Sequence, residues 1–376
     1  MAGGVSVVLL TGATGLVGRG LIRCLSQPFR QLTLLTRYPE KLEDVTAKGP
    51  VRVLRGDITL PQLGFDGETY ARLTRSTSEI IHCAADTRFG ISPDCASRVN
   101  VAGTQQVISF AAQCTQLQKF AYVSTVYVVG RSSGYFREEL VRQENGFSNA
   151  YQQSKYQAEE LVARATAIIP ATIFRLSSVI GECNGTVRQF NHVHRLIRLL
   201  PQNLLPVVPG RADAPIDLIA SDWAIPALAH LFESAFVPGR VYHLCAGGKH
   251  SLTLPDILEL TISVFESHPA GRKFLPIETP EFVPLARYED YLAERSRDGD
   301  RLFQELARVL GYFLPHLAIF QAFDNSQTML DLAPSGLEFP STRECLKRVV
   351  NYCLDTNWGK SAGGLSDNTW PSQSTF

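Results

Sequence analysis

The chain has 376 residues, and its 36 basic and 36 acidic side chains cancel to a formal net charge of zero. This balance argues against a protein that binds nucleic acid or an anionic membrane over a large surface of one sign. With 45% hydrophobic and 19% charged residues, the composition excludes a disordered chain and predicts a large folded core. No apolar run approaches the ~18 to 20 residues of a membrane helix, and no secretory signal is evident, so we expect no membrane span and a cytoplasmic location.

The first half of the sequence alternates short β-branched runs with helix-length segments. Strands are expected at 5–10, 32–36, 51–54, 80–83, 120–124 and 172–175. Helices are expected at 16–26, 93–114 and 149–168. This alternation predicts an α/β Rossmann fold, in which a doubly wound parallel sheet is covered by helices on both faces.

After Gly181 the alternation stops, and a Pro-rich stretch is followed by an expected helix at 222–233 and a strand at 241–244. From Leu254 onward the chain is expected to form helices and loops, with solvated surface over the charge-mixed section 278–308. The expected parts are a cofactor-binding core over 1–181 completed by 215–245, a smaller, mostly helical substrate-binding region over 182–214 and 246–358, and a flexible tail over 359–376.

Eight cysteines are scattered through the chain, and no two of them form a Cys-x-x-Cys pair. This spacing fits neither a zinc ribbon nor a disulfide scaffold. We expect free thiols and no metal site.

A glycine-rich turn follows the first expected strand and opens a helix, with the sequence Thr11-Gly12-Ala13-Thr14-Gly15-Leu16-Val17-Gly18. Glycines permit a tight turn and a close approach of the backbone to a pyrophosphate, and the helix N-terminus faces the anion. At the first strand-to-helix turn of such a series, the pattern predicts a dinucleotide site.

Basic residues flank the expected position of the adenosine ribose. Arg19 directly follows the last glycine, and Arg37 ends the second strand where an NAD enzyme usually has an acidic residue. Two guanidinium groups suit a 2′-phosphate, so the sequence favours NADP(H) over NAD(H), the alternative being two surface arginines on an NAD enzyme. Asp57, followed by Ile58, comes after the third strand and is placed to bond the adenine edge.

Tyr151 and Lys155 are four residues apart at the start of an expected helix, so they share one face. An ammonium beside a phenol lowers the phenol pKa toward the range in which it can exchange protons. Ser124 and Thr125 end the fifth strand and supply hydroxyls at the carboxyl edge of the sheet, where such folds bind ligands.

Together these motifs resemble the extended branch of the short-chain dehydrogenase/reductase superfamily. The similarity covers residues 1 to about 245, and its further matches are Gly56-Asp57 and Asn100-Val101-Ala102-Gly103-Thr104. It implies that Asn100 supports a water path to Lys155, and that Lys155 also holds the nicotinamide ribose.

Within that branch, the stretch His82-Cys83-Ala84-Ala85-Asp86-Thr87-Arg88-Phe89 is similar to fatty acyl-CoA reductases and thioester reductase domains, and places Cys83, Ala84 and Ala85 beside the cofactor. Tyr122-Val123-Ser124-Thr125 and the stretch from Ile216 to Trp223 are similar to the same group. The resemblance implies that Thr125, rather than Ser124, is the catalytic hydroxyl.

The segment between Cys183 and Ala212 contains four arginines, two histidines and no acidic residue. On a helix, Arg188, His192, Arg195 and Arg198 would share one face, with Leu196, Leu199 and Leu200 on the other. Such a basic lid would attract a CoA phosphate or an acidic carrier protein. A merely solvated basic helix is the alternative.

The resemblance therefore implies an NADPH-dependent reductase of an acyl thioester, bound to CoA or to an acyl carrier protein, that gives an aldehyde or an alcohol. The alternatives are a nucleotide-sugar epimerase or dehydratase, an alcohol or steroid dehydrogenase, and a non-catalytic dinucleotide sensor. The sequence leaves the oligomeric state open.

Overall fold

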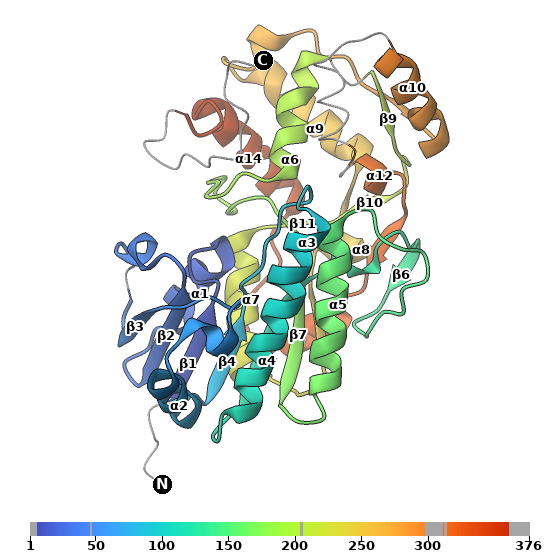
Figure 1. Ribbon diagram of the computed structural model, residues 1–376. Helices are drawn as coiled ribbons and strands as arrows, with labels where there is room; N and C mark the ends of the chain where they lie inside the picture. Colours follow the sequence, from blue (N-terminus) through green and yellow to red (C-terminus); the bar gives the residue numbers. More distant parts are fainter. Residues whose placement is uncertain (1–5, 46, 204–205, 298–310, 312–313, 361–376) are drawn as a thin grey trace.

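One parallel sheet of seven strands forms the lower half of the molecule in this computed structural model (Figure 1). The structure describes residues 6–45, 47–203, 206–297, 311 and 314–360. The strands are β1 Ser6–Thr11, β2 Arg30–Thr36, β3 Val51–Arg55, β4 Glu79–His82, β5 Lys119–Thr125, β7 Ala171–Leu176 and β12 Val241–Leu244. Their order is β12-β7-β5-β4-β1-β2-β3, so the chain reverses direction across the sheet between β1 and β4. The expected Rossmann fold is confirmed, and ligands of such folds bind at this reversal.

Helices cover both faces of this sheet. They are α1 Leu16–Leu25, α2 Gly67–Ser76, α3 Pro93–Ala96, α4 Gly103–Gln113, α5 Ala150–Ala165 and α7 Ser221–Ser234. Between α3 and α4 the backbone forms a π-helical segment, Ser97–Ala102, so the helix expected at 93–114 runs on without a break. Short 3-10 turns lie at Pro39–Leu42, Pro61–Gly64, Val126–Val129, Leu200–Gln202, Arg272–Phe274 and Ala333–Ser335.

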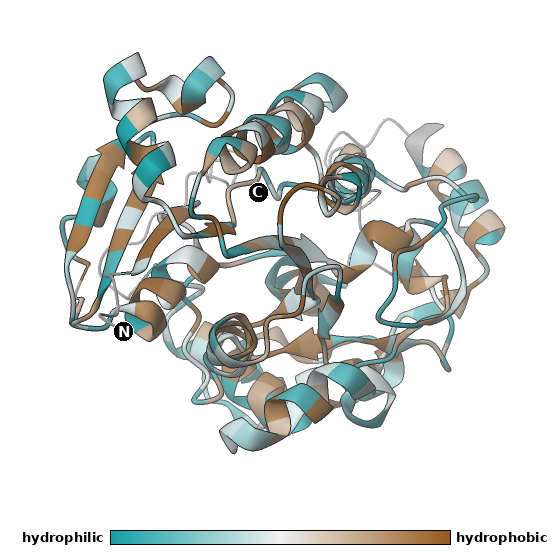
Figure 2. Ribbon diagram, turned by 90° about the horizontal axis from the view of Figure 1, so that it is seen from below, coloured by the Kyte–Doolittle hydropathy of each residue, from teal (hydrophilic) through white to brown (hydrophobic). Residues whose placement is uncertain are grey.

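The core follows from the alternation of side chains along the strands. In β1, Val8 and Leu10 pack into the cluster that includes α1 and α7, whereas Leu9 packs into the cluster that includes α4 and α5. Successive side chains of a strand point to opposite faces, and both faces are covered, so the central strands are mainly apolar, whereas the edge strand β3 is partly exposed. Figure 2 shows mostly hydrophobic strands between helices whose colours change along their length.

The upper half of the molecule is mostly helical and has its own apolar cluster (Figure 1). Its helices are α6 His192–Leu199, α8 Gly247–His250, α9 Leu254–Ser267, α10 Leu285–Arg297, α12 Leu314–Leu317 and α14 Thr342–Asp355. Short strand pairs join them: β8 Ser178–Val179 with β11 Leu218–Ile219, β9 Val207–Pro209 with β14 Glu281–Val283, and β10 Pro215–Ile216 with β13 Leu252–Thr253.

One segment of the expected substrate-binding region lies against the cofactor-binding core instead. Strand β15, Gln321–Phe323, pairs with β6, Gly134–Phe136. Helix α13, Ser326–Leu332, then packs on α7 and β12, and Leu332 is buried in the core cluster of the sheet. These contacts join residues that are far apart in the sequence, so no local sequence pattern predicts them.

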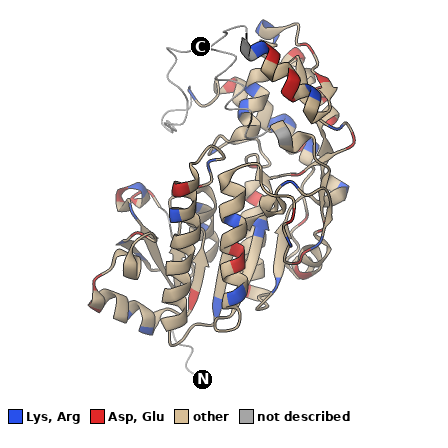
Figure 3. Ribbon diagram, turned by 45° about the vertical axis from the view of Figure 1, so that its right-hand side comes forward, with Lys and Arg blue, Asp and Glu red and all other residues tan. Residues whose placement is uncertain are grey.

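Part of the charge-mixed section forms the helix α10, and not all of it is solvated surface. Val283 and Tyr288 are buried there, in a small cluster that includes Leu285 and Leu292. Figure 3 shows residues of both signs on this helix, and its charged residues Arg287, Glu289, Asp290, Glu294 and Arg295 are exposed. Residues 298–308 of the section lie outside the described residues.

Candidate active site

The turn after β1 has the geometry of a phosphate-binding loop. Gly12 has a φ of 73°, and a Cβ atom there would lie 2.6 Å from the amide nitrogen of Ala84. A Cβ on Gly18 would collide with the carbonyl oxygen of Gly12. Within the described residues no side chain caps the N-terminus of α1, so its amide groups face the cleft. Only glycine fits at these positions, and its lack of a side chain lets the backbone come close to a pyrophosphate.

A cleft of about 1770 Å³ extends from this loop along the carboxyl edge of the sheet. It is lined by the expected cofactor residues Gly12, Thr14, Gly15, Leu16, Val17, Gly18, Arg37, Asp57, Ile58, Cys83, Ala84 and Ala85. Thr125 and Tyr151 line the same cleft. The structure thus brings the glycine loop, the adenosine-side residues and two of the expected catalytic hydroxyls into one continuous space.

The basic groups at the adenosine end differ from those expected. Arg37 lines the cleft together with Lys41, which the sequence reading missed. Both cations lie beside the exposed ring of Tyr38, at 5.5 and 5.0 Å from its centroid. Arg19 is not among the lining residues, because its guanidinium donates to Asp44 at 3.1 Å and to the Lys41 carbonyl. The position of Arg19 directly after the last glycine therefore did not indicate that its side chain lines the cleft, because Asp44 binds the guanidinium.

Thr11 does not line the cleft, and its side chain instead makes hydrogen bonds that hold the neighbouring loops in place. Its buried hydroxyl lies 2.7 Å from Nδ1 of His82 and accepts a hydrogen bond from the amide of Ala84 at 3.2 Å. The other ring nitrogen of His82 lies 3.0 Å from the Thr104 hydroxyl. Burial lowers the pKa of His82 to about 3, so the imidazole is neutral. Its two contacts connect β4 to the end of β1 and to α4.

Tyr151 lies in the first turn of α5, which begins where Asn149 accepts a hydrogen bond from the Gln152 amide at 3.0 Å. Burial raises the pKa of the Tyr151 phenol, and a hydrogen bond with the Thr125 hydroxyl opposes that rise. The two hydroxyls that the sequence singled out are therefore in contact. The expected lowering of the phenol pKa by Lys155 is not seen, since burial dominates.

Lys155 shares the buried face of α5 with Tyr151. Its Nζ donates to the Val123 carbonyl at 2.8 Å and lies 4.1 Å from the centroid of the Tyr122 ring. Burial lowers the pKa of Lys155 to about 7, against the attraction of Glu159 one turn further along the helix. A small change in its surroundings therefore decides whether this lysine is charged at neutral pH.

Glu159 belongs to a buried ion pair that the sequence reading missed. Its carboxylate accepts hydrogen bonds from Nε and Nη2 of Arg175 on β7, at 2.9 and 2.7 Å. Nη1 of Arg175 donates to the Glu139 carbonyl at 2.9 Å and lies 3.1 Å from Nε2 of His243. These bonds tie the helix that carries Tyr151 and Lys155 to the edge of the sheet.

Ser124 and Asn100, both predicted to be catalytic, are not among the residues that line the cleft. The Ser124 hydroxyl is buried and has no hydrogen-bond partner among the described residues. Asn100, in the π-helical segment, donates to the Ser154 hydroxyl at 2.9 Å and exchanges hydrogen bonds with the backbone of Asp86. Its contacts with α5 and with the loop after β4 agree with a supporting role, and its link to a water path stays a prediction.

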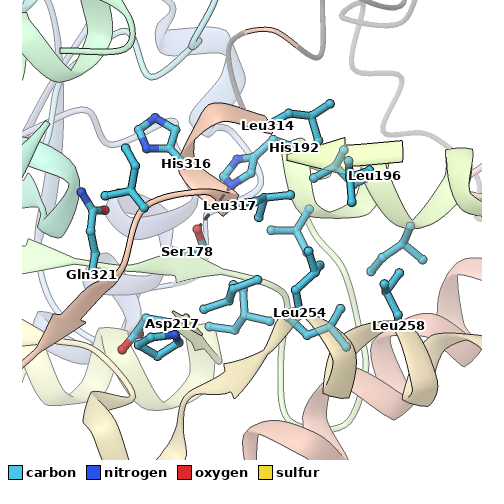
Figure 4. A pocket seen from close by; sticks show the side chains of 18 of the residues that line it. Ser178, His192, Leu196, Asp217, Leu254, Leu258, Leu314, His316, Leu317 and Gln321 are labelled. Atoms are coloured by element: carbon cyan, nitrogen blue, oxygen red, sulfur yellow. Dashed lines mark hydrogen bonds between the residues drawn. The ribbon is translucent and has the colours of Figure 1, made fainter. Parts of the chain in front are cut away.

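A second cavity lies between the sheet and the helices of the upper half (Figure 4). Its walls are largely apolar, with Leu196, Leu254, Leu258, Leu314 and Leu317 among the lining residues. Four residues line both this cavity and the cofactor cleft: Phe89, Tyr127, Ser178 and His192. The two spaces therefore adjoin where Thr125 and Tyr151 lie.

Stacked rings mark this junction. Phe89 stacks on the Tyr151 ring at 5.4 Å and on the His192 ring at 4.8 Å between centroids. The Tyr127 hydroxyl lies 2.9 Å from that of Ser178, which lies 3.4 Å from Nε2 of His192. Nothing local in the sequence marks Phe89, Tyr127, Ser178 and His192 as neighbours.

The basic lid differs from its expected form. Helix α6 begins at His192, so Arg188 lies outside it and the expected helical face is wrong. His192 and Leu196 both line the apolar cavity, whereas Arg188, Arg195 and Arg198 line neither cavity. Arg188 pairs with Glu182 at 2.5 Å, just before the acid-free segment, and Arg198 lies 5.9 Å from the ring centroid of Trp358. Substrate binding by these three arginines stays a prediction, and their absence from the lining of both spaces does not support it.

Comparison with known proteins fits this geometry. The profile of the family described as Male sterility protein matches residues 10–228, more than half of the chain. The chain belongs to this family. It is an NAD(P)-binding oxidoreductase of the extended short-chain dehydrogenase/reductase type, similar to fatty acyl-CoA reductases and to reductase domains of large synthetases.

Two relatives illustrate this range. Fatty acyl-CoA reductase 1 of Gallus gallus is 25% identical, over 93% of this chain and 83% of the relative. The hybrid PKS-NRPS synthetase pydA of Acremonium sp is 32% identical over 90% of this chain but only 8% of its own length. The chain thus spans less than a tenth of that synthetase.

Solved structures share the fold. The terminal R domain from the myxalamid PKS-NRPS pathway superposes with a TM-score of 0.76 and 22% identity, covering 95% of this chain and 93% of the domain. UDP-glucuronic acid 4-epimerase from Bacillus cereus superposes with a TM-score of 0.65 and 19% identity, covering 95% of this chain and 99% of the epimerase. Since reductase and epimerase share the fold, the choice between them depends on the site.

Two features are absent from the described residues. In the part of the chain that the structure describes, no helix combines the length and apolarity needed to cross a bilayer. No cluster of metal-ligating side chains occurs among the same residues, and all eight cysteines are free thiols there.

Proposed function

We propose that the chain is an NADPH-dependent reductase of acyl thioesters, presented on CoA or on a carrier protein. The observation that supports this most is the apolar cavity that adjoins the cofactor cleft beside Tyr151 and Thr125. An acyl chain is the substrate part that gains most from apolar walls, at roughly 25 cal/mol per Å² of buried surface. A sugar in the same space would lose hydrogen bonds to water with few partners to replace them.

The residues of the cleft suit the cofactor. The loop at Gly12 and the N-terminus of α1 would hold the pyrophosphate, Asp57 would lie at the adenine, and Arg37 with Lys41 would bind a 2′-phosphate. When bound, NADPH supplies the hydride that adds to the thioester carbonyl carbon. Lys155 would hold the nicotinamide ribose.

The hydroxyls of Thr125 and Tyr151 would donate hydrogen bonds to the carbonyl oxygen, where negative charge develops. Tyr151 then transfers its proton to that oxygen, which gives a hemithioacetal. The C–S bond breaks as the hydroxyl proton returns to Tyr151, and the sulfur leaves and is protonated to the thiol while the carbonyl re-forms as an aldehyde. Reduction of the aldehyde in a second turnover would give the alcohol.

The test is NADPH oxidation by the purified protein, followed by absorbance, with acyl-CoAs and acyl-pantetheines of increasing chain length. Product analysis distinguishes aldehyde from alcohol. We expect turnover of thioesters and none of UDP-sugars. Turnover of a UDP-sugar, or oxidation of an apolar alcohol by NADP⁺, without any thioester reduction would replace the proposal by one of the alternatives.

A further inference from the structure

One polar side chain in the apolar cavity has an unused hydrogen-bonding atom. His316, in α12, lines the cavity, and Figure 4 shows it at the same end as Ser178, His192 and Gln321, whereas Leu254 and Leu258 lie toward the other end. Its Nδ1 is buried and has no hydrogen-bond partner among the described residues. A buried polar atom without a partner costs stability, so such an atom in a binding cavity points to a ligand group.

The surroundings of His316 determine which of its nitrogens carries the proton. Its Nε2 lies 2.7 Å from Nε2 of Gln152. The other end of that amide, Oε1, accepts a hydrogen bond from the backbone amide of Ser148 at 3.1 Å, which fixes the orientation of the amide. An NH₂ group can only donate, so Nε2 of His316 must accept, and the single proton of the neutral ring is on Nδ1.

The ring is neutral for an independent reason. Burial, together with Arg131, lowers the pKa of His316 to about 4, so a second proton is absent at neutral pH. The unpaired atom is therefore an N–H donor, and it requires an acceptor.

Asp217 and Gln321, two other polar residues of the cavity, already have hydrogen-bond partners. Asp217 accepts hydrogen bonds from the amides of Ala246 and Gly247, and the amide nitrogen of Gln321 donates to the carbonyls of Gly130 and Ser132. The Thr261 hydroxyl is also without a partner among the described residues, but a hydroxyl can turn to donate or accept and so specifies nothing. His316 alone of these presents a donor of fixed direction.

The position of the donor relates it to the reacting carbon. Gln152 is the neighbour of Tyr151 on α5, and the His316 ring lies 6.0 Å from that of Tyr127, one of the four junction residues. His316 thus lies at the end of the cavity near the proposed reaction centre, where its donor would meet the part of the acyl chain next to the thioester, and the leucine-lined end would take the remainder.

We propose that His316 selects acyl thioesters that carry an oxygen acceptor near the thioester carbonyl, as in 3-oxo, 3-hydroxy or amide-bearing acyl groups, over plain fatty acyl chains. This inference rests on the proposed function and narrows its substrate class. A plain chain would leave the N–H of His316 without a partner in the closed complex, and an acceptor oxygen would satisfy it.

The experiment compares pantetheine thioesters of equal chain length: decanoyl, 3-oxodecanoyl, 3-hydroxydecanoyl, and an N-acylglycyl thioester as the amide form. The kcat/KM for NADPH oxidation is measured for each. We expect wild type to favour at least one oxygenated substrate over decanoyl by about tenfold, the size of one well-placed hydrogen bond. The three oxygenated substrates distinguish ketone, hydroxyl and amide.

Two variants assign the preference to Nδ1. His316→Phe keeps a ring but removes the donor, and should reduce the ratio of kcat/KM values to near one by lowering only the oxygenated substrate. His316→Asn places an amide N–H close to the position of Nδ1 and should keep the preference. Because each ratio is taken on one preparation, loss of folded protein cancels.

The outcomes are distinct. Equal kcat/KM values in wild type, an equal loss on both substrates in His316→Phe, or loss of the preference in an active His316→Asn overturns the inference while thioester reduction stands. Should His316→Phe be inactive, wild type and His316→Asn still decide. Failure of every thioester overturns the proposed function and this inference with it.

Discussion

The cofactor cleft and the apolar cavity are built in opposite ways. The cleft is lined largely by loops that directly follow the strands of one sheet, so many of its residues come in short consecutive runs such as Thr14–Gly18 and Cys83–Ala85. The cavity is lined mostly by single residues and pairs from many elements between Phe89 and Phe323, with one longer run at Pro215–Leu218. A contiguous site is tied to its backbone, whereas a dispersed one can change residue by residue, and this difference suggests that the cleft fixes the reaction and the cavity the substrate.

The largest expected effect is in the cleft. Tyr151→Phe removes the proton donor and one oxyanion contact, and should lower kcat by about 10³-fold. NADPH affinity, measured by fluorescence titration, should stay within about threefold, since the change leaves the phosphate loop intact. Tyr156→Phe, one turn along the same helix, is the matched control and should keep wild-type kcat. A comparable loss in the control would mean that α5 itself is disturbed.

A smaller effect is expected at the adenosine end of the same cleft. Arg37→Asp should lower the ratio of kcat/KM for NADPH over NADH by about 100-fold, because it replaces a phosphate ligand with a like charge. Arg19→Gln should change this ratio little, since the Arg19 guanidinium is directed at Asp44. If Arg19→Gln has the larger effect, the adenosine end of the cleft differs from the arrangement described.

The cavity is tested by filling it. Leu258→Trp adds volume at the leucine-lined end and should raise KM for a long-chain thioester by about tenfold, while short-chain thioesters and NADPH are unaffected. Leu330→Trp, at a position 66% exposed on α13, is the control for the added indole. An equal rise in KM for all chain lengths would contradict the assignment of this end to the acyl tail.

The smallest expected effect is in the pH dependence of kcat/KM. Burial lowers the pKa of Lys155 to about 7 and those of the cavity histidines His192 and His316 to about 3 and about 4. Of these three groups, only Lys155 titrates near neutrality, although it does not itself line the cleft. If protonated Lys155 is the active form, it is lost as pH rises, and kcat/KM should fall about fivefold from about pH 7 to about pH 8. Lys155→Arg should flatten this limb, and an unchanged limb would assign the titration to another group.

The extent of sequence-based prediction follows the same division. The strands, the glycine loop, Thr125 and Tyr151 were predictable because each depends on a local period or spacing. The Glu159–Arg175 pair, Lys41 and His316 were not, since their roles depend on partners up to 164 positions away, as in the contact of Gln152 with His316. The helical face expected for the basic lid is wrong because α6 begins only at His192, and the count of charges within 183–212 omitted Glu182, the partner of Arg188.

The stacked ring of Phe89 connects the two regions energetically. It lies on the loop that also carries the cofactor-lining residues Cys83–Ala85, and it contacts both Tyr151 and His192. A ligand in either space that moves this loop changes the shape of the other. Binding of the dinucleotide and of the acyl group should therefore be thermodynamically linked, each altering the affinity for the other by the same factor.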